Sequence, residues 1–282
     1  MFWRLGACEP GMLRALPMAR VVVTACVAIS CFGSAYAQES SEELAKKLSN
    51  PVANLISIPF QFNYNGGIGP EEDGSQYYMN FQPVIPLTIN ENWNLISRTI
   101  LPIVYQNDVF PGAGSQFGFG DTTQSFFLSP SQPWHGFVWG VGPVLGIPTG
   151  SGSLLSSETL NVGPTAVALW QGSGWTIGAL ANQQWSVAGP DDRPDVNSTF
   201  MQPFVAYTTN DAWTFTLNTE STYNWETQDW SVPINFVVSK VVKFDRLPVQ
   251  LFAGIRYWAA SAEDVGPTGW GARWGLTILL PK

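Results

Sequence analysis

Four charged side chains stand out because their strands otherwise carry Ser, Thr, Asn, Gln and Gly on the polar face. These residues are Arg98, Glu220, Arg256 and Arg273. The strand periodicity described below points all four toward the same side of the sheet. Enclosed together, they would form a charged constriction in the lumen of a barrel, and such rings of charge set which ions pass. The alternative is a structural network in which these charges only satisfy one another.

Two of these charges fall on the same predicted hairpin. If the last hairpin is centred between residues 264 and 265, Arg256 and Arg273 lie directly opposite each other. Like charges in that position destabilise a strand pair, so the two arginines need a counterion or a bound anion. Glu220 lies near the middle of its own strand, and we expect it to supply the negative charge.

Enzyme chemistry has few candidate residues. His135 is the single histidine, and it lies in a predicted turn beside Ser129 and Ser131. A Ser–His pair needs hydrogen-bond contact and a third orienting group, which neighbours in one turn do not supply. Residues 112–120 are rich in Gly but lack the Lys of a phosphate-binding loop. The sequence therefore predicts that the protein is not an enzyme, and it predicts no metal and no cofactor.

The first 37 residues read as an export signal. Arg14 and Arg20 precede an apolar run that ends in small residues, which is typical of a secretory signal peptide cut after Ala37. Lipid attachment at Cys31 is an alternative. All three cysteines would leave with this segment, so the mature chain would hold no disulfide. The translation start stays open among Met1, Met12 and Met18.

The composition narrows the class of protein. The chain has 282 residues, 13 Lys plus Arg against 21 Asp plus Glu, a net charge of −8, only 12% charged residues and 13 Trp. The aromatic content excludes a disordered chain, and the negative charge argues against a nucleic-acid partner. Beyond residue 37 no apolar run is long enough for a membrane helix, which needs roughly 18 residues. An all-β protein of the cell envelope remains.

Polar and apolar residues alternate over long segments, which indicates strands with one apolar face. The predicted strands are 56–65, 76–89, 93–106, 121–129, 137–148, 160–171, 175–187, 198–209, 213–226, 230–243, 248–258 and 269–280. Strands in soluble proteins usually have roughly five or six residues, and most of the predicted strands are longer. Their lengths suit tilted membrane strands, which need about 9–11 residues.

The two faces of these strands indicate which one meets lipid. The polar face is weakly charged, as in an enclosed lumen, and the apolar face ends in aromatic residues, as in membrane-interface girdles. The aromatic ends are Trp93, Trp175 and Trp213 on one side, and Tyr64, Tyr105, Trp185, Trp225 and Tyr257 on the other. The sequence predicts an all-β, transmembrane, antiparallel, up-and-down β-barrel of about twelve strands. A β-sandwich with an aromatic core is the alternative.

The predicted domains are a signal peptide (1–37), a periplasmic segment (38–51) and an outer-membrane barrel (52–282). Within 38–51, Ser41, two glutamates and two lysines predict a short helix with charges matched to its dipole. This helix either lies free in the periplasm or enters the barrel through residues 39–49 and plugs it. Twelve strands leave open whether the lumen conducts. The predicted outer loops are mostly longer than the inner turns, and they are acidic.

Several motifs carry a resemblance to a known family. They are Asn50-Pro51-Val52-Ala53-Asn54-Leu55-Ile56-Ser57, Asn92-Trp93-Asn94-Leu95-Ile96-Ser97-Arg98-Thr99, Gly118-Phe119-Gly120-Asp121, Gly140-Val141-Gly142-Pro143 and Asn218-Thr219-Glu220-Ser221. With these motifs the chain resembles Gram-negative outer-membrane "transporter" proteins and the family named after the MetA pathway of phenol degradation, whose members are sometimes called neuromedin U. One departure is the ending Leu279-Leu280-Pro281-Lys282, where such barrels commonly end in an aromatic residue.

The resemblance implies an outer-membrane channel for passive uptake of small solutes, with hydrophobic or aromatic compounds as one class. Its expected partners are outer-membrane lipid, lipopolysaccharide and the barrel-insertion machinery, and the cargo is not defined. The lumen-facing aromatic residues Phe204, Phe252 and Trp258 would suit a narrow or hydrophobic path. A closed structural barrel and an outer-membrane lipid-modifying enzyme are the alternative functions.

Overall fold

The structure is a computed structural model that describes residues 39–280. The predicted signal peptide, residues 1–37, lies outside this range. The elements are α2 (Ser41–Leu48), β1 (Ile56–Ile68), β2 (Gly74–Phe81), β3 (Val84–Thr88), β4 (Trp93–Asn107), β5 (Ser115–Phe119), β6 (Thr122–Pro130), β7 (Phe137–Ile147), β8 (Leu160–Gly172), β9 (Trp175–Ala188), β10 (Asn197–Thr208), β11 (Trp213–Thr219), β12 (Ser221–Asn224), β13 (Asp229–Phe244), β14 (Leu247–Ala260) and β15 (Gly269–Leu280).

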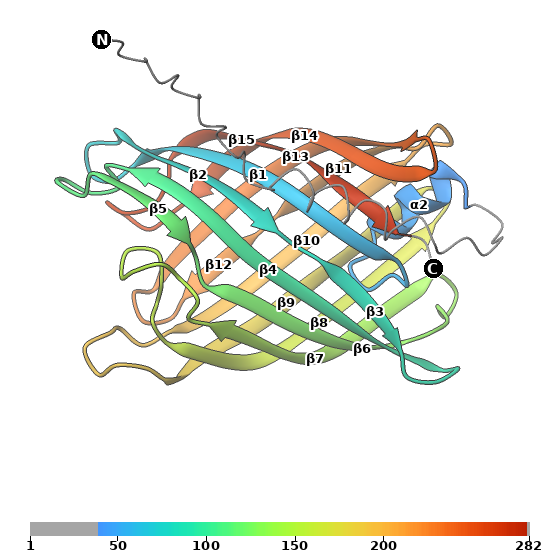
Figure 1. The fold of residues 1–282 in the computed structure, drawn as a ribbon, viewed down its shortest axis with the longest axis horizontal. Helices are drawn as coiled ribbons and strands as arrows, with labels where there is room; N and C mark the ends of the chain where they lie inside the picture. The colour runs from blue at the N-terminus through green and yellow to red at the C-terminus, as the bar shows by residue number, and fades with distance from the viewer. Residues whose placement is uncertain (1–38, 281–282) are drawn as a thin grey trace, which may run out of the picture. The chain divides into compact units, whose positions relative to one another are not determined.

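The strands form one closed antiparallel barrel of 12 strands, which confirms the predicted fold (Figure 1). Each strand pairs with its neighbours in the sequence, and β15 pairs with β1 from Ile56↔Leu280 to Tyr64↔Ala272. Three of the strands are interrupted, so that β2 and β3, β5 and β6, and β11 and β12 are each two parts of one strand. Closure leaves no unpaired sheet edge, as a membrane-spanning sheet requires.

A proline lies in or opposite each interruption, and proline has no backbone N–H to donate to a neighbouring strand. Pro83 lies in the gap between β2 and β3, where its carbonyl accepts from the N–H of Thr99 at 3.1 Å. The N–H groups of Gly120 and Glu220, in the other two gaps, donate to the carbonyls of Pro102 at 2.9 Å and Pro233 at 3.4 Å. Each interruption is therefore a local loss of hydrogen bonds within a continuous strand.

One predicted connection was too long. Residues 107–120 were expected to form a loop, but β5 occupies Ser115–Phe119 and pairs with β4. Gly112 and Gly114 have φ angles of 81° and 60°, a left-handed conformation that glycine adopts without strain. The chain therefore reverses direction around Gly112 and Gly114, and β5 begins at the next residue, Ser115.

The outward face of the barrel is apolar and ends in aromatic residues on both sides. Trp175 and Trp213 are exposed at one end of their strands, while Tyr105, Trp185 and Tyr257 are exposed at the opposite end. Neighbouring rings contact each other along these rows, as Trp175 does with the ring of Tyr207 at 4.9 Å between centroids. This pattern is typical of a barrel with lipid outside and aromatic girdles at both interfaces.

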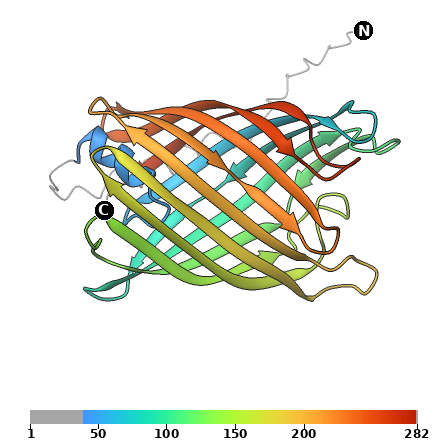
Figure 2. The same cartoon turned by 180° about the vertical axis from the view of Figure 1, so that it is seen from behind.

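The two ends of the barrel differ in their connections. At the end where β1 begins, here called the helix end, the turns are short, for example residues 173–174 and 245–246. At the other end, here called the loop end, the connections include residues 148–159, 189–196 and 261–268. Figures 1 and 2 show α2 at the end of the short turns. The predicted alternation of long and short connections is thus present.

Helix α2 begins with a capping box. The Ser40 side chain accepts from the Glu43 N–H, and the Glu43 carboxylate accepts from the Ser40 N–H, both at 3.1 Å. The cap is therefore one residue before Ser41, the predicted start. No helix within residues 39–280 has the length and apolar character needed to cross a membrane.

Helix α2 packs against the inner wall of the barrel at the helix end. Leu44 and Ala45 are fully buried against inward-facing Leu55, Val241 and Leu279. Gln171 of β8 donates to the carbonyl of Lys46 at 2.9 Å, and Lys243 of β13 donates to that of Glu39 at 3.3 Å. Of the two predicted placements, the structure shows the helix entering the mouth and not lying free outside the barrel.

The residues after the helix cross the lumen before β1 begins. Val52 is buried against Ile96, Phe127, Val167 and Leu169, which face inward from β4, β6 and β8. We refer to residues 39–54 as the N-terminal segment. Because its contacts reach β1, β4, β6, β8, β13 and β15, it covers the lumen at the helix end.

Candidate functional site: the barrel interior

The structure brings three of the four predicted charged residues into direct contact. Glu220 lies in the gap between β11 and β12, and its carboxylate accepts two hydrogen bonds from Arg273, at 2.8 and 2.6 Å. Arg256 donates to the same carboxylate at 3.2 Å. We call Glu220, Arg256 and Arg273 the charge cluster. The two-pronged contact with Arg273 is the strong geometry for an arginine and a carboxylate.

Arg256 is completely enclosed by hydrogen-bond acceptors. Its side chain is 1% exposed, and besides Glu220 it donates to four other side chains. These partners are Asn235 at 2.8 Å, Tyr78 at 2.7 Å, Asn65 at 3.2 Å and Asn63 at 3.3 Å. Guanidinium has five N–H donors, so Arg256 has no donor left for a solute.

The predicted opposition of Arg256 and Arg273 is wrong. Arg256 pairs with Gly271, and Arg273 pairs with Gly254, a register offset of two residues from the expected one. An offset of two residues keeps both side chains facing inward, and it removes the repulsion between like charges directly across the hairpin. Gly271 also leaves space for the contact between Arg256 and Asn65 across β15. A Cβ at residue 271 would lie 3.3 Å from Asn65 Oδ1, which accepts a hydrogen bond from Arg256.

Arg98 is different from the other two arginines. It lies on β4, which β15, β1 and the strand formed by β2 and β3 separate from β14, and it lines the same cavity as Arg273. Among residues 39–280, its one hydrogen bond is a long one, at 3.5 Å, to Gln82 Oε1. It lies within electrostatic range of Glu220, whose carboxylate is already engaged by Arg256 and Arg273. Arg98 therefore keeps donors that no described side chain uses.

Sequence reasoning missed the neutral partners of the charge cluster. Asn63 Oδ1 accepts from both Arg256 and Arg273, and Asn65 accepts from Arg256 and from the indole of Trp258 at 3.2 Å. The signal was present in the alternation of β1, where Gln61, Asn63 and Asn65 share the inward face. Which inward residues meet across neighbouring strands depends on register, and the register was not known.

A row of carboxamide side chains runs from this site across adjacent strands, near the loop end of the barrel. Asn65 contacts Gln76, Gln76 contacts Gln106, and Gln106 contacts Gln116, at 3.4, 3.2 and 3.1 Å. Each pair is a cross-strand pair of adjacent strands. The inner wall is therefore polar across β1, β2, β4 and β5 near the loop end.

The connection 148–159 folds onto this wall at the loop end. The Leu154 carbonyl accepts from Gln106 at 3.5 Å, and Ser151 lies against Gly118, where a Cβ would come within 2.6 Å. Asp121 fixes the loop by accepting from Ser156 and Ser157 at 2.6 to 2.8 Å. This loop narrows the mouth opposite the N-terminal segment.

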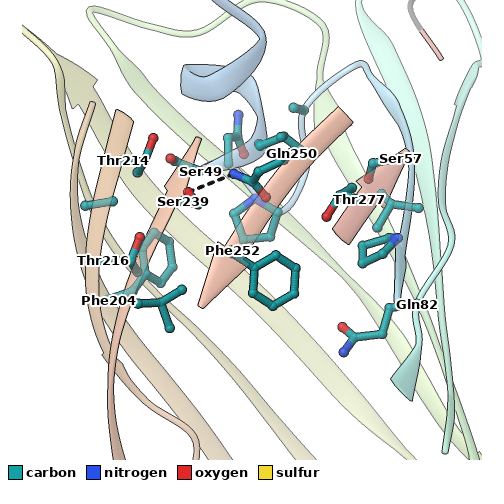
Figure 3. A pocket seen from close by; sticks show the side chains of 18 of the residues that line it. Ser49, Ser57, Gln82, Phe204, Thr214, Thr216, Ser239, Gln250, Phe252 and Thr277 are labelled. Carbon is teal, nitrogen blue, oxygen red and sulfur yellow. Dashed lines mark hydrogen bonds between the residues drawn. The ribbon is translucent and has the colours of Figure 1, made fainter. Parts of the chain in front are cut away.

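Between the N-terminal segment and the charge cluster lies a cavity of about 260 Å³, which we call the lumen cavity. Figure 3 shows side chains from both sides of the barrel pointing into it, including Phe204, Thr216, Phe252 and Gln82. Arg98 and Arg273 lie in its wall, and residues 47–51 and Ala53 close one side. The cavity is thus bounded by two of the four predicted charged residues and by the N-terminal segment.

The residues considered for enzyme chemistry do not converge. His135 lies in the turn between β6 and β7 with a φ angle of 49°, and its ring contacts that of Trp134 at 5.3 Å. Ser129 donates to the carbonyl of Trp139 at 2.7 Å. Within the part of the chain that the structure describes, no three His, Cys, Asp or Glu residues are grouped as metal ligands.

The closed 12-strand barrel, its lipid-type outer face and its polar interior define the class of protein: this is the fold of an outer-membrane β-barrel. No family model matches the sequence, and a search among curated proteins finds no match.

Two solved structures share this fold, and a third is less similar. An outer membrane channel from Pseudomonas putida F1 is similar over 80% of this chain and 96% of its own, with a TM-score of 0.64 and 13% sequence identity. The NanC porin is similar over 79% of this chain and 100% of its own, with a TM-score of 0.52 and 11% identity. Outer membrane phospholipase A from Escherichia coli covers 80% of this chain and 90% of its own, with a TM-score of 0.49 and 12% identity. At these identities, the first two likenesses establish the fold alone.

Proposed function

We propose that this protein is an outer-membrane channel for passive uptake of small solutes, with no catalytic step of its own. The observation that carries this proposal is the lumen cavity of about 260 Å³, bounded by charged and polar side chains. A barrel that served only as a structural anchor would fill its interior with packed side chains, as small barrels do. The resemblance to the transporter family and to the phenol-degradation family supports the same function.

The charges inside the barrel favour anions in this proposal. The interior holds Arg98, Arg256 and Arg273, and within residues 39–280 Glu220 is the one acid that pairs with any of them, which gives an excess of positive charge. The acidic connection with Glu71, Glu72 and Asp73 is exposed to solvent, where salt screens its field. Charges within the lumen are screened less, so they dominate selectivity.

In this proposal the loop end faces the outside of the cell and the helix end faces the periplasm. Long outer loops and short inner turns are the usual construction of outer-membrane barrels. The lipid partners are then lipopolysaccharide at the loop end and phospholipid at the helix end, and assembly depends on the barrel-insertion machinery. Cleavage of a signal peptide after Ala37 belongs to the same export route.

A closed barrel is the second candidate, and a specific observation favours it. The N-terminal segment covers the lumen at the helix end through buried contacts of Leu44, Ala45 and Val52. If this segment never moves, solutes cannot pass. The two candidates therefore differ in whether the N-terminal segment leaves its place.

Conductance in planar lipid bilayers tests the proposal. We expect the purified full chain to conduct, and a variant lacking residues 39–49 to conduct more, because the helix no longer covers the lumen. Under a salt gradient, Arg256→Ala and Arg273→Ala should each shift the reversal potential toward cations, whereas Arg246→Ala, in an exposed turn, should not. Absence of conductance in both the full chain and the deletion variant would establish the closed barrel. Unaltered selectivity in both arginine variants would remove the charge cluster from any role in permeation.

A further inference from the structure

The lumen cavity has a lining that suggests a more specific ligand than small solutes in general. Its wall combines Arg98, whose one hydrogen bond among the described residues is to Gln82, with a set of carboxamide and hydroxyl groups and two phenyl rings. Figure 3 shows several of the polar side chains and both rings, Phe204 and Phe252. Each of these three features matches a different chemical part of a single molecule.

Arg98 is the group that would recognise a negative charge. The other arginine of the cavity wall, Arg273, is committed to Glu220 and to Asn63 at 2.8 Å. Arg98 makes one hydrogen bond, at 3.5 Å, among the described residues, so most of its five donors face the cavity without a protein acceptor. A carboxylate accepts two parallel hydrogen bonds from a guanidinium, which is a strong and specific contact.

The carboxamides and hydroxyls would recognise hydroxyl groups. Carboxamide and hydroxyl groups are each both donor and acceptor, like the hydroxyl groups of a solute. The residues of this kind in the lining are Ser57, Gln61, Gln82, Gln202, Thr214, Thr216, Asn218, Ser239, Gln250 and Thr277. A purely hydrophobic solute would displace water from these groups and leave them unpaired, at a cost of about 1–3 kcal/mol for each group.

The phenyl rings would contact the carbon skeleton. Phe252 pairs with Gly275 across the β14–β15 hairpin, and a Cβ at Gly275 would lie only 2.6 Å from the Phe252 ring. The glycine therefore allows the ring to lie against the wall of β15. Phe204 lines the cavity from β10. Two rings among many polar groups fit a molecule that has a compact carbon ring and hydroxyls around it.

We propose that the lumen cavity binds a small polyhydroxylated carboxylate of the sugar-acid class. Arg98 binds the carboxylate, the carboxamides bind the hydroxyls, and Phe252 and Phe204 pack against the carbon ring. The cavity of about 260 Å³ lies just below the range of about 300–1,000 Å³ for sites of drug-sized ligands, which limits the ligand to about the size of a monosaccharide. The inference rests on the proposed channel function, because a solute reaches this cavity only through the lumen.

Binding of D-glucuronate to the full chain in detergent, followed by titration calorimetry, tests the inference. Glucose serves as the probe that lacks the carboxylate, and benzoate as the one that lacks the hydroxyls. We expect glucuronate to bind at least tenfold more tightly than either. Arg98→Gln should weaken glucuronate binding by about 10- to 100-fold, the effect of losing charge-assisted hydrogen bonds, and leave glucose unchanged.

Two variants keep this test decisive. Arg98→Lys retains the charge, so it should recover part of the glucuronate affinity, while Arg246→Gln removes a charge from an exposed turn and should change nothing. Folding of each variant is checked by the shift in gel mobility on heating. Tighter binding of benzoate than of glucuronate, or equal binding of glucuronate by Arg98→Gln, would overturn the inference.

Conductance measured on the same samples separates this inference from the proposed function. A conducting barrel that does not bind glucuronate contradicts the sugar-acid site and leaves the channel intact. Glucuronate binding that depends on Arg98 in a barrel that never conducts supports the site and contradicts the channel.

Discussion

The charge cluster and the N-terminal segment both occupy the lumen, but different forces hold them. Glu220, Arg256 and Arg273 are tied by charge-assisted hydrogen bonds, and separating them would leave buried charges without partners. The N-terminal segment is held mainly by buried Leu44, Ala45 and Val52. When the N-terminal segment leaves its place, it separates apolar side chains from one another, and this exposes no unpaired buried charge. The comparison indicates that the segment is the part able to move, and that the cluster is a fixed part of the wall.

The largest effect is expected from Glu220→Gln. This change removes the carboxylate from two arginines that are 1% and 4% exposed, so the free energy of unfolding should fall by roughly 3–5 kcal/mol. Urea titration of the barrel in lipid vesicles, followed by tryptophan fluorescence, measures it. Glu91→Gln, in an exposed turn, is the control and should change stability by less than about 0.5 kcal/mol. If the two variants unfold alike, the cluster does not stabilise the interior.

A smaller and local effect is expected from Leu44→Ala. Leu44 is 1% exposed, and its truncation should weaken the attachment of the N-terminal segment by about 2 kcal/mol, the low end of the range for buried leucine. Hydrogen exchange of the amides in 41–48 should accelerate by roughly 30-fold, while the urea midpoint of the barrel stays unchanged. A lower midpoint without faster exchange would mean that the segment is an integral part of the barrel.

Arg193→Gln should have a still smaller effect, at the loop end. Arg193 donates to the carbonyls of Ser153, Ser156 and Ser157 at 2.8, 2.5 and 3.3 Å. Losing the charged donor should loosen the loop 148–159 by about 1–2 kcal/mol. Hydrogen exchange within this loop reports the change, and Arg246→Gln is the matched control. The Arg193 side chain is more exposed than that of Arg256, so its loss should cost less free energy. A loss of stability as large as that of Glu220→Gln would show that burial does not determine the size of these effects.

The smallest effect is expected from Lys46→Gln. Lys46 pairs with Glu42 one turn earlier in α2, and both side chains are partly exposed. Such surface pairs contribute at most about 0.5 kcal/mol, so exchange of the helix amides should rise less than threefold. A larger acceleration than that of Leu44→Ala would show that charges, and not apolar contacts, hold the N-terminal segment.

The sequence by itself determined the architecture. Alternation in segments such as 56–65 and 213–226 fixed which side chains face lipid and which face the lumen, because the side-chain period of a strand is two. It also placed Arg98, Glu220, Arg256 and Arg273 on one side of the wall. These properties follow from each strand alone, so they needed no knowledge of its neighbours.

The tertiary structure decided what those inward residues meet. The pairing of Arg256 with Gly271, the contacts of Asn63 and Asn65 with the arginines, and the burial of Val52 depend on register and on approach across the lumen. A register offset of two residues leaves the alternation of each strand unchanged, so the pattern cannot distinguish it. For the same reason, only the folded barrel separates Arg98, which makes one long hydrogen bond, from Arg256 and Arg273, which both bind the Glu220 carboxylate.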